Sequence, residues 1–283
     1  MIKFRLYREY GALNSPPIFD AVEQGIKNIG HAVDNQNPDV NVIWSVLWNG
    51  RMKMNKIIYE KSLQQKKPVL IIEVGNLARG QTWRISLDHI QNQGFFGNTE
   101  DLDELRPKKL GISLSPEKLN RKKQILIAGQ HQLSQQWHGM PQMDAWVERK
   151  ILEIRKYTDR PIIVRPHPRS FFTISNKNVR IEYPKKVINT YDNFDIDYDY
   201  HCIVNHSSGP PVQAAIDGVP VITSTHSLAY PISDQIENIE NPILKDRSQW
   251  FLQICHIEWT VEELRQGIPF KRLEREILNR ISG

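Results

Sequence analysis

Short apolar runs of strand length alternate, from one end of the chain to the other, with longer segments whose apolar residues recur at helical spacing. The run PVLIIEV at 68–74 is nearly continuous in its apolar character, as in strands that are covered on both faces. The segment 15–29 opens with Ser15-Pro16-Pro17, a helix-start signal, and is followed by Gly30. Such an alternation predicts βαβ units with largely parallel sheets, and therefore an α/β fold.

These patterns form two groups along the chain. The first group predicts strands at 2–7, 40–46 and 68–74 and helices at 15–29 and 54–65. The second group predicts strands at 124–128, 161–168, 201–206 and 219–223 and helices at 144–157 and 211–217. Each group is a doubly wound unit, in which ligands bind outside the carboxyl ends of the strands.

A charged stretch punctuated by prolines, LRPKKLGISLSPEKLNRKK at 105–123, separates the two groups. With 283 residues, the chain is long enough for two domains of ordinary size. We therefore predict a first domain at 1–118 and a second at 119–260. After a helical stretch at 251–259, a capping-box pattern that begins at Thr260 starts a last helix, at 261–283.

The most informative segment is HCIVNHSSGPPVQAAIDGVPVIT at 201–223. A predicted buried strand ends in Asn205–Gly209, and Pro210-Pro211 then starts a short helix. Backbone N–H groups and the positive end of the helix dipole converge at such a turn, and small side chains let an anion approach closely. This loop is therefore our candidate for a diphosphate site, to which the hydroxyls of Ser207 and Ser208 add donors. The alternative is that one of the two serines only caps the helix.

A second loop with anion-binding residues follows the preceding strand of the second group. The strand PIIV ends in Arg165-Pro166-His167-Pro168-Arg169, where alternating prolines stiffen the backbone. Guanidinium groups pair bidentately with phosphate oxygens, so Arg165 and Arg169 are candidates to clamp the same anion. His167 is a candidate donor to the phosphate or to the leaving group.

Composition and missing motifs exclude several classes of protein. The sequence contains neither GxxxxGK[ST] nor GxGxxG, which disfavours P-loop kinases and standard dinucleotide dehydrogenases. Its two cysteines, Cys202 and Cys255, lack CxxC spacing, so we expect free thiols and no metal site. No apolar run approaches the roughly 20 residues of a membrane span, and we expect a cytoplasmic protein without a membrane partner. The net charge of +5 favours a polyanionic partner in a general way.

The order of the motifs resembles the nucleotide-sugar half of GT-B glycosyltransferases. A strand that ends in RPHP precedes a strand that ends in NHSSG, a helix with AAI and the segment GVPVI. This half is similar to capsule-type transferases, and the size and basic charge of the chain resemble phage enzymes that glycosylate hydroxymethylated pyrimidines in DNA. The resemblance implies two Rossmann-like domains facing across a cleft, with the nucleotide sugar on the second, the acceptor on the first, and the C-terminal helix packed back on the first. The nucleotide-sugar candidates are Arg165, His167, Arg169, Asn205, His206, Ser207, Ser208, Gly209, Gln213, His226 and Tyr230.

Candidates for a catalytic base lie in the first domain, at the end of the 68–74 strand and in the polar and aromatic segment 76–97, which we interpret as a loop. A sugar transfer that inverts the anomeric centre needs a carboxylate or an imidazole to take the proton of the acceptor hydroxyl. Asp88 is the first candidate, and Glu73 and His89 follow.

The same segment supplies the candidates for acceptor binding, Arg79, Trp83, Arg84 and Phe95. Aromatic rings stack on flipped or single-stranded bases, and guanidinium groups hold the phosphates. Two alternatives stay open. The aromatic residues could form a small core, and Glu73 could serve only to anchor Arg79 or Arg84, because a carboxylate in a buried strand requires a partner.

We predict a monomeric, inverting glycosyltransferase that uses a nucleotide sugar, with UDP-glucose as the favoured donor. The favoured acceptor is 5-hydroxymethylpyrimidine in DNA, which would place a phage-encoded protein in the host cytoplasm. Assistance by Mg²⁺ or Mn²⁺ is left open. The alternatives are a capsule or glycan transferase, a nucleotide-sugar epimerase that acts on the donor alone, and a non-catalytic nucleic-acid-binding protein.

Overall fold

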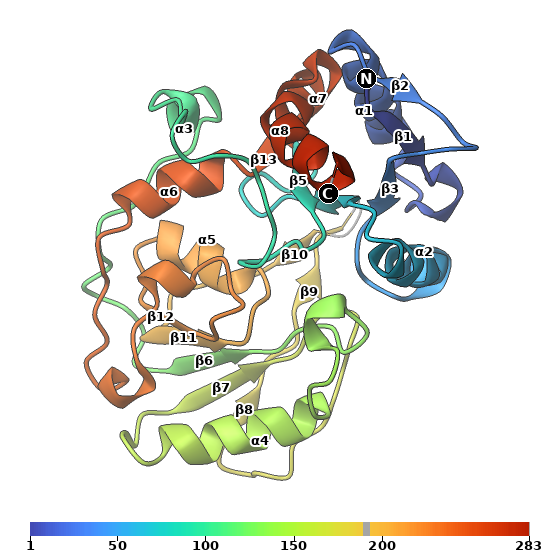
Figure 1. The fold of residues 1–283 in the computed structure, drawn as a ribbon. Helices are drawn as coiled ribbons and strands as arrows, with labels where there is room; N and C mark the ends of the chain where they lie inside the picture. Colours follow the sequence, from blue (N-terminus) through green and yellow to red (C-terminus); the bar gives the residue numbers. More distant parts are fainter. Residues whose placement is uncertain (189–192, 283) are drawn as a thin grey trace. The chain divides into compact units, whose positions relative to one another are not determined.

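The computed structural model describes residues 1–188 and 193–282 and divides the chain into two compact units (Figure 1). Gly283, the last residue of the predicted C-terminal helix, lies outside the described residues. Unit 1 comprises Met1–Arg106, Leu133–Gln135 and Leu252–Gly283, and unit 2 comprises Pro107–Gln132 and Gln136–Phe251. Each unit is built on its own sheet.

The sheet of unit 1 has the strand order β13-β5-β4-β3-β1-β2. Its strands are β1 (Lys3–Leu6), β2 (Ala32–Val33), β3 (Val40–Trp44), β4 (Val69–Val74), β5 (Thr82–Leu87) and β13 (Glu258–Thr260). The strands from β2 to β4 are parallel, and β5 and β13 add antiparallel partners at the β4 edge. The chain passes from β1 to β2 on one side and to β3 on the other, so this sheet has a topological switch point between β1 and β3.

Helices cover both faces of this sheet. They are α1 (Pro16–Asn28), α2 (Lys53–Gln64), α7 (Val261–Gln266) and α8 (Ile268–Ser282), with short turns η1 (Arg8–Tyr10) and η2 (Gly50–Met52). Side chains alternate along β3: Val42 and Trp44 join a core with α1 and α8, whereas Ile43 joins a smaller core with Tyr59 of α2. This two-sided burial explains why the central strands are apolar runs.

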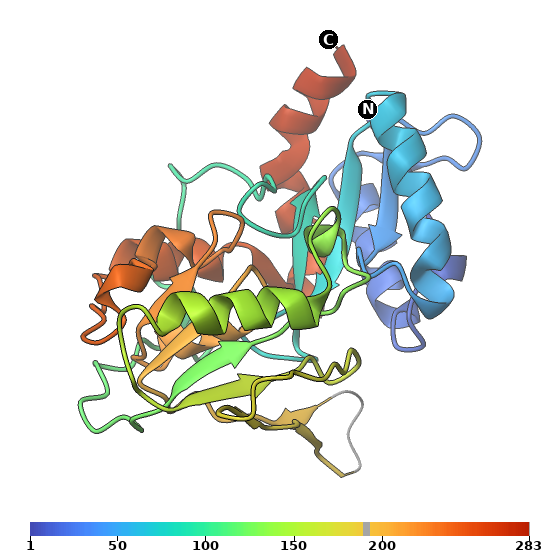
Figure 2. The ribbon, with the colours of Figure 1, turned by 90° about the horizontal axis from the view of Figure 1, so that it is seen from below.

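The C-terminal segment completes the core of unit 1. Leu264 of α7 and Phe270 and Ile277 of α8 belong to the cluster that also contains α1. Figure 2 shows the C-terminal helix α8 in red. The predicted capping box is confirmed, because the Thr260 side chain accepts from the N–H of Glu263 and the Glu263 side chain accepts from the N–H of Thr260. Helices α1 and α7 approach so closely that a side chain at Gly25 would overlap the carbonyl oxygen of Leu264.

Two predictions about secondary structure in unit 1 are wrong. Residues 82–87, assigned to a loop, form the buried strand β5, where Trp83, Ile85 and Leu87 alternate with polar residues. The stretch 251–259, assigned to a helix, ends its helix at Cys255 and continues into β13, which pairs with β5. β13 is stabilised by pairing with β5, a segment more than 170 residues away that local sequence does not report, whereas β5 also forms a hairpin with β4.

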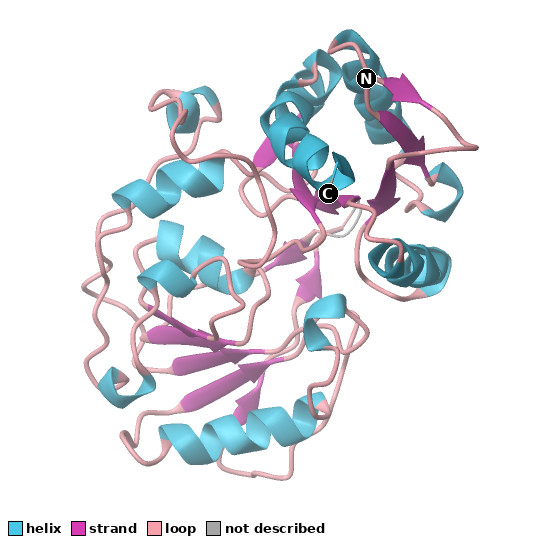
Figure 3. Cartoon of the chain, viewed as in Figure 1, coloured by secondary structure: helices cyan, strands magenta, loops and turns pink. Residues whose placement is uncertain are grey.

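Unit 2 contains a sheet in which every neighbouring pair is parallel, in the order β12-β11-β6-β7-β8 (Figure 1). Figure 3 shows the strands in magenta and the helices in cyan. The strands are β6 (Ile125–Ala128), β7 (Ile162–Arg165), β8 (Arg180–Ile181), β11 (Cys202–Asn205) and β12 (Val221–Thr223). From the first strand the chain moves outward through β7 and β8, and it then returns to the other side of β6 for β11 and β12. This is the Rossmann order, with its switch point between β6 and β11. The predicted α/β class with two Rossmann-like units is confirmed.

Helix α4 (Met143–Ile154) lies on one face of the unit 2 sheet and α5 (Pro210–Ile216) on the other (Figure 1). Trp146, Val147 and Ile151 of α4 pack against the strands in one core. The remaining elements are α3 (Arg106–Lys109), α6 (Ser248–Cys255), η3 (Gln135–Trp137), η4 (Tyr230–Ile232), η5 (Ile236–Asn238) and a ribbon of β9 (Lys185–Lys186) and β10 (Phe194–Asp195). The unit boundary falls inside α6, between Phe251 and Leu252.

The contact between α1 and α7 leads to a stability prediction. Gly25→Ala should lower the free energy of unfolding by roughly 1–3 kcal/mol, because the new methyl group meets backbone that cannot rotate away. Gln24→Ala, one residue earlier on the exposed face, is the control and should change stability by less than about 0.5 kcal/mol. Urea unfolding measures both, and a Gly25→Ala protein as stable as the wild type would contradict the close packing.

Candidate functional site

The candidate site of unit 2 lies at the carboxyl ends of β6 and β11, the two strands that flank the switch point. Gly129, Gln130 and His131 follow β6, and the segment 206–209 follows β11. The register pairs Asn205 with Ala128, so the two strands end at the same level. The loops that follow them therefore emerge side by side.

Buried hydrogen bonds tie the two loops together. The Asn205 side-chain amide donates to the Ala128 carbonyl over 2.6 Å and to Ser208 Oγ over 2.8 Å. Gln130 Oε1 accepts from the backbone N–H of Ser207 at 3.1 Å and from its hydroxyl at 3.3 Å. Asn205, Gln130 and Ser207 are all buried, so these groups form the floor of the loop.

The loop carries two adjacent backbone amides, those of Ser208 and Gly209. Among the described residues, the N–H groups of Ser208 and Gly209 donate to no protein acceptor, whereas Ser207 N–H is used by Gln130. Pro210 and Pro211 have no N–H, which restricts the donors at the start of α5 to these two adjacent amides. Gly209 is the N-cap, and no side chain caps the helix, so neither serine has the capping role considered above. Both residues with an unused amide are only half-buried.

Rings surround the His206 side of the loop. The His206 imidazole lies edge-on to Trp137, with ring centroids 5.3 Å apart, and 5.4 Å from the ring of His226. Burial, followed by the charge of His226, lowers the pKa of His206 to about 4, so this imidazole is neutral at pH 7. His226 and Tyr230 are exposed, and Gln213 points its amide at Asp217 on the same helix, 3.4 Å away.

The RPHPR loop meets the β6 loop through two imidazoles. The rings of His167 and His131 lie edge to face with centroids 5.2 Å apart. His167 Nδ1 accepts from the backbone N–H of Arg169 at 3.1 Å, which fixes the ring relative to its own loop. Burial and then the charge of Arg169 lower the pKa of His131. His167 is half-buried and Arg169 is exposed, so both lie where a ligand at this edge could reach them.

Arg165, by contrast, is buried and bonded within the unit. Its guanidinium donates to the Tyr200 hydroxyl at 2.9 Å, to the Asp197 carbonyl at 2.9 Å and to Glu182 Oε2 at 3.4 Å. It also lies over the Tyr200 ring, 5.3 Å from the centroid. These contacts hold the side chain inside the protein instead of presenting it to an anion.

In unit 1 the structure separates the two carboxylates proposed as a base. Glu73 lies near the carboxyl end of β4, opposite Arg84, whereas Asp88 pairs with Val69 at the start of the strand. Four residues of strand, or about 13 Å, lie between the two levels. Only Glu73 is at the edge of the parallel strands where ligands bind. Its Oε2 accepts from the Ser45 hydroxyl at 2.7 Å, at the end of β3, and the side chain is half-buried.

Asp88 is engaged in holding the opposite edge of the sheet. Its Oδ1 accepts from the Val69 N–H at 2.9 Å, and its other oxygen is ion-paired with Arg280 of α8. Its carbonyl accepts from the Tyr59 hydroxyl at 2.9 Å, and its φ of 63° places it in the left-handed region. The neighbouring His89 ring lies edge-on to Tyr59, with centroids 6.4 Å apart.

The four predicted acceptor-binding residues differ in exposure. Arg84 is 2% exposed and ion-paired with Glu258 over 3.2 Å. Trp83 is buried in the main core of unit 1 and Phe95 packs against that core, so the two do not form the separate small core considered as the alternative. Arg79 is exposed, in the loop that follows β4.

Three residues that sequence reasoning missed help to build these sites. Gln130 holds the Ser207 turn, Trp137 packs on His206, and Glu258 binds Arg84. Gln130 had a signal, since it comes two residues after the predicted strand 124–128 at a strand end of a doubly wound unit. Trp137 and Glu258 had none, because their partners are distant in sequence.

The described part of the chain offers neither a metal cluster nor a membrane-spanning helix. Across residues 1–188 and 193–282, no three His, Cys, Asp or Glu side chains gather as a metal ion would require. Over the same ranges, no helix combines the length and apolar character needed to cross a membrane.

Neither a protein-family model nor a curated protein sequence matches the chain. Solved structures with a similar fold include two from Thermosulfurimonas dismutans KpsC. The β-Kdo 2,7 transferase shares 12% identity over 97% of this chain and 100% of that chain, at a TM-score of 0.48. The β-Kdo 2,4 transferase shares 12% identity over 89% of both chains, at 0.49. The glycosyltransferase SnogD from Streptomyces nogalater shares 10% identity over 96% of this chain and 98% of that chain, at 0.32. Because these scores are below 0.5, the fold assignment rests on the strand orders above.

The burial of His206 leads to a pH prediction. Its native pKa of about 4 lies below its ordinary value of 6.5, so the native state binds the proton less readily than the unfolded chain. This residue should therefore contribute stability above pH 6.5 and lose about 3 kcal/mol of it as the pH falls to 4. An NMR titration should show the His206 ring resonance with a midpoint near 4, and a midpoint near 6.5 would contradict the buried, neutral imidazole.

Proposed function

We propose that the chain is a glycosyltransferase whose donor is a nucleoside-diphosphate sugar, and that it binds this donor on unit 2. The observation that carries the proposal is the pair of unused, adjacent amides of Ser208 and Gly209 at the switch point of a Rossmann-ordered sheet. Unused N–H groups at the start of a helix attract a phosphate through hydrogen bonds and through the helix dipole. Doubly wound sheets bind nucleotides at this position.

The groups near these amides suit the remainder of a nucleotide sugar. Arg169 and His167 emerge on the neighbouring loop and provide a cation and a hydrogen-bond donor for the phosphates. Exposed His226 and Tyr230 are the candidates for contacts with the sugar. We assign Arg165 to the support of this loop through Tyr200, in place of the direct phosphate contact expected from the sequence.

For the base we favour Glu73 over Asp88 and His89, because Glu73 lies at the carboxyl edge of the parallel strands of unit 1. In an inverting transfer the Glu73 carboxylate takes the proton of an acceptor hydroxyl, whose oxygen attacks the anomeric carbon. The bond from that carbon to the phosphate oxygen breaks, and the nucleoside diphosphate leaves with the electron pair. The hydroxyl of Ser45 donates to Glu73 and orients it for this step.

Charge is the property that points to an acceptor class. The net charge of +5 and the exposed Arg79 support a polyanion, and 5-hydroxymethylpyrimidine in DNA is the acceptor we would test first. A glycan acceptor is the second candidate within the same activity.

The decisive experiment is a transfer assay with a labelled sugar. The donor panel contains UDP-glucose, UDP-N-acetylglucosamine and an activated Kdo, the sugar for which the KpsC structures are named, each with Mg²⁺, Mn²⁺ or EDTA. The acceptors are DNA with 5-hydroxymethylcytosine or 5-hydroxymethyluracil, unmodified DNA and capsule oligosaccharides. Transfer from either UDP-sugar to any acceptor supports the proposal and identifies the substrate. Conversion of the donor to an isomer without acceptor would establish an epimerase instead. If the protein neither turns over a donor nor binds UDP, the proposal of a nucleotide-sugar enzyme is refuted.

A pair of carboxylate variants separates the candidate base from the structural carboxylate. Glu73→Gln should reduce the rate of transfer at least 100-fold, in the range of a lost general base, with little effect on UDP affinity. Asp88→Asn should keep more than a third of the transfer rate but lower the stability slightly, because the Asp88–Arg280 ion pair is lost while Arg280 keeps its ion pair with Glu276. Rates with the labelled donor and urea unfolding measure the two effects. The reverse pattern would return Asp88 to the mechanism.

The adjacent serines provide a second matched pair. Ser208→Ala should weaken UDP binding by about 1–2 kcal/mol, since the half-buried hydroxyl no longer donates to phosphate. Ser207→Ala should lower stability and leave affinity nearly unchanged, because the buried Ser207 hydroxyl bonds to Gln130. Calorimetry measures the UDP affinity of the wild type and of the two variants. Equal affinity in all three proteins would mean that the diphosphate binds elsewhere.

A further inference from the structure

Glu258 carries a carboxylate that is fully buried in unit 1 and surrounded by donors. Its side chain is 0% exposed and belongs to β13, near the C-terminal end of the chain. Oε1 accepts from the backbone N–H of Asn76 at 2.6 Å and from Arg84 Nη2 at 3.2 Å. Oε2 accepts from the backbone N–H of Leu77 at 2.9 Å and from the hydroxyl of Thr82 at 3.0 Å. Each carboxylate oxygen thus binds one backbone amide of the same loop.

That loop, Gly75–Gln81, is here called the acceptor loop, and it follows β4 directly. Its first residue has no room for a side chain, since a Cβ at Gly75 would overlap the Glu258 carboxylate and the Thr82 hydroxyl. After Gly75, whose N–H donates to the Thr82 carbonyl, the two following amides leave the strand ladder and bond to Glu258 instead. The path of the chain out of β4 is therefore set by a side chain from β13.

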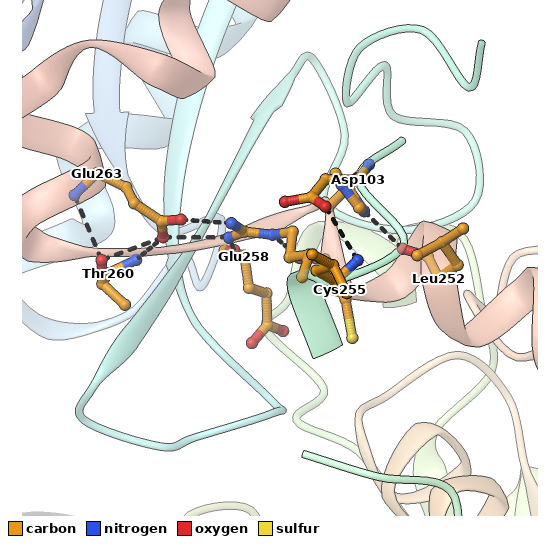
Figure 4. Close-up of polar contacts among 9 residues, drawn as sticks. Asp103, Leu252, Cys255, Glu258, Thr260 and Glu263 are labelled. Carbon is orange, nitrogen blue, oxygen red and sulfur yellow. Dashed lines mark hydrogen bonds and ion pairs between the residues drawn. The ribbon is translucent and has the colours of Figure 1, made fainter. Parts of the chain in front are cut away.

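The strand that carries Glu258 is itself anchored from its other side. Arg106, 5% exposed, donates to the Glu258 carbonyl at 2.6 Å, and it also binds the Glu263 carboxylate and the Cys255 carbonyl (Figure 4). Its guanidinium lies over the Trp259 ring, 4.1 Å from the centroid. Arg106 thus contacts β13 directly at the Glu258 carbonyl and the Trp259 ring, which anchors the backbone that carries the Glu258 carboxylate.

Stability alone does not require a carboxylate at this position. Removing a buried charge from water is costly, and an apolar pair of similar volume is often as stable as a buried ion pair. A carboxylate does what an apolar side chain cannot, because its two oxygens hold two successive N–H groups in one orientation. The geometry therefore favours a role in fixing the backbone of the loop.

We infer that Glu258 is a positioning residue that holds the acceptor loop in its working conformation, an inference that rests on the proposed function. The loop begins two residues after Glu73, the base proposed above, and carries the exposed Arg79, the proposed acceptor contact. By fixing Asn76 and Leu77, Glu258 sets where the acceptor lies relative to the carboxylate that deprotonates it.

The first test measures the loop directly, by hydrogen exchange of the Asn76 and Leu77 amides. Glu258→Gln should accelerate their exchange at least tenfold, because one oxygen becomes an amide NH₂ that faces a backbone N–H. Glu263→Gln is the matched control, with the same chemical change five residues away, at a carboxylate that binds Arg106 and not the loop. It should change these two exchange rates less than twofold.

Thr82→Val provides a milder second variant, in case the uncompensated Arg84 charge unfolds Glu258→Gln. At nearly constant volume it removes the hydroxyl that donates to Glu258 and that also bonds to the backbone of Ala78, and it should accelerate the same two amides at least threefold. If Asn76 and Leu77 exchange as in the wild type in the folded variants, Glu258 does not position the loop and the inference fails.

Activity measurements separate this inference from the proposed function. In the transfer assay, Glu258→Gln should lower kcat/KM for the acceptor at least tenfold more than Glu263→Gln does, while affinity for UDP changes less than twofold. An equal loss in the two variants would reduce Glu258 to a structural residue. If the wild type transfers no sugar, the proposed function fails, and the exchange rates still decide whether Glu258 fixes the loop.

Discussion

The register between β6 and β11 is the constraint on which the candidate donor site depends. Because the chain winds outward through β7 and β8 before it returns for β11, these two neighbours come from segments about 75 residues apart, and both end at the Ala128–Asn205 pair. A shift of one residue would turn every side chain to the opposite face and break the Asn205–Ala128 bond. The sheet therefore determines which amides are paired and which face the switch point.

Burial of charge distinguishes the framework of each unit from its candidate sites. Arg84, Arg106 and Arg165 are all buried, and each binds carbonyl or carboxylate oxygens of the protein. A buried cation requires such partners within the protein. An arginine that lies near a loop in the sequence is therefore weak evidence that the loop binds an anionic ligand. The residues proposed for chemistry, Glu73, Ser208 and Gly209, are instead half-buried. Their partial exposure leaves them open to a substrate.

Periodicity predicted much of this fold. The strands at 40–46, 68–74, 124–128 and 201–206 and the Asn205–Gly209 turn were found close to their predicted places, because their signals are local. β5 was missed although TWRISL alternates strictly, because Arg84 and Ser86 are polar and Glu258, the partner of Arg84, is 174 residues away. β13 was missed because its pairing with β5 is equally distant. The choice of Asp88 as base had the same weakness. Asp88 is close to Glu73 in sequence, but the β4–β5 hairpin places the two residues at opposite ends of β4.

In both units the candidate groups follow the carboxyl ends of parallel strands, and the two units provide different parts of the proposed reaction. In each, the direction in which the chain adds strands reverses at a switch point, between β6 and β11 in unit 2 and between β1 and β3 in unit 1. The groups left for chemistry follow the carboxyl ends of strands at or beside these points: two amides suited to a phosphate in one unit, and a carboxylate oriented by Ser45 in the other. A transfer reaction needs both an anion holder and a base, and a chain of two Rossmann-like units supplies one edge for each.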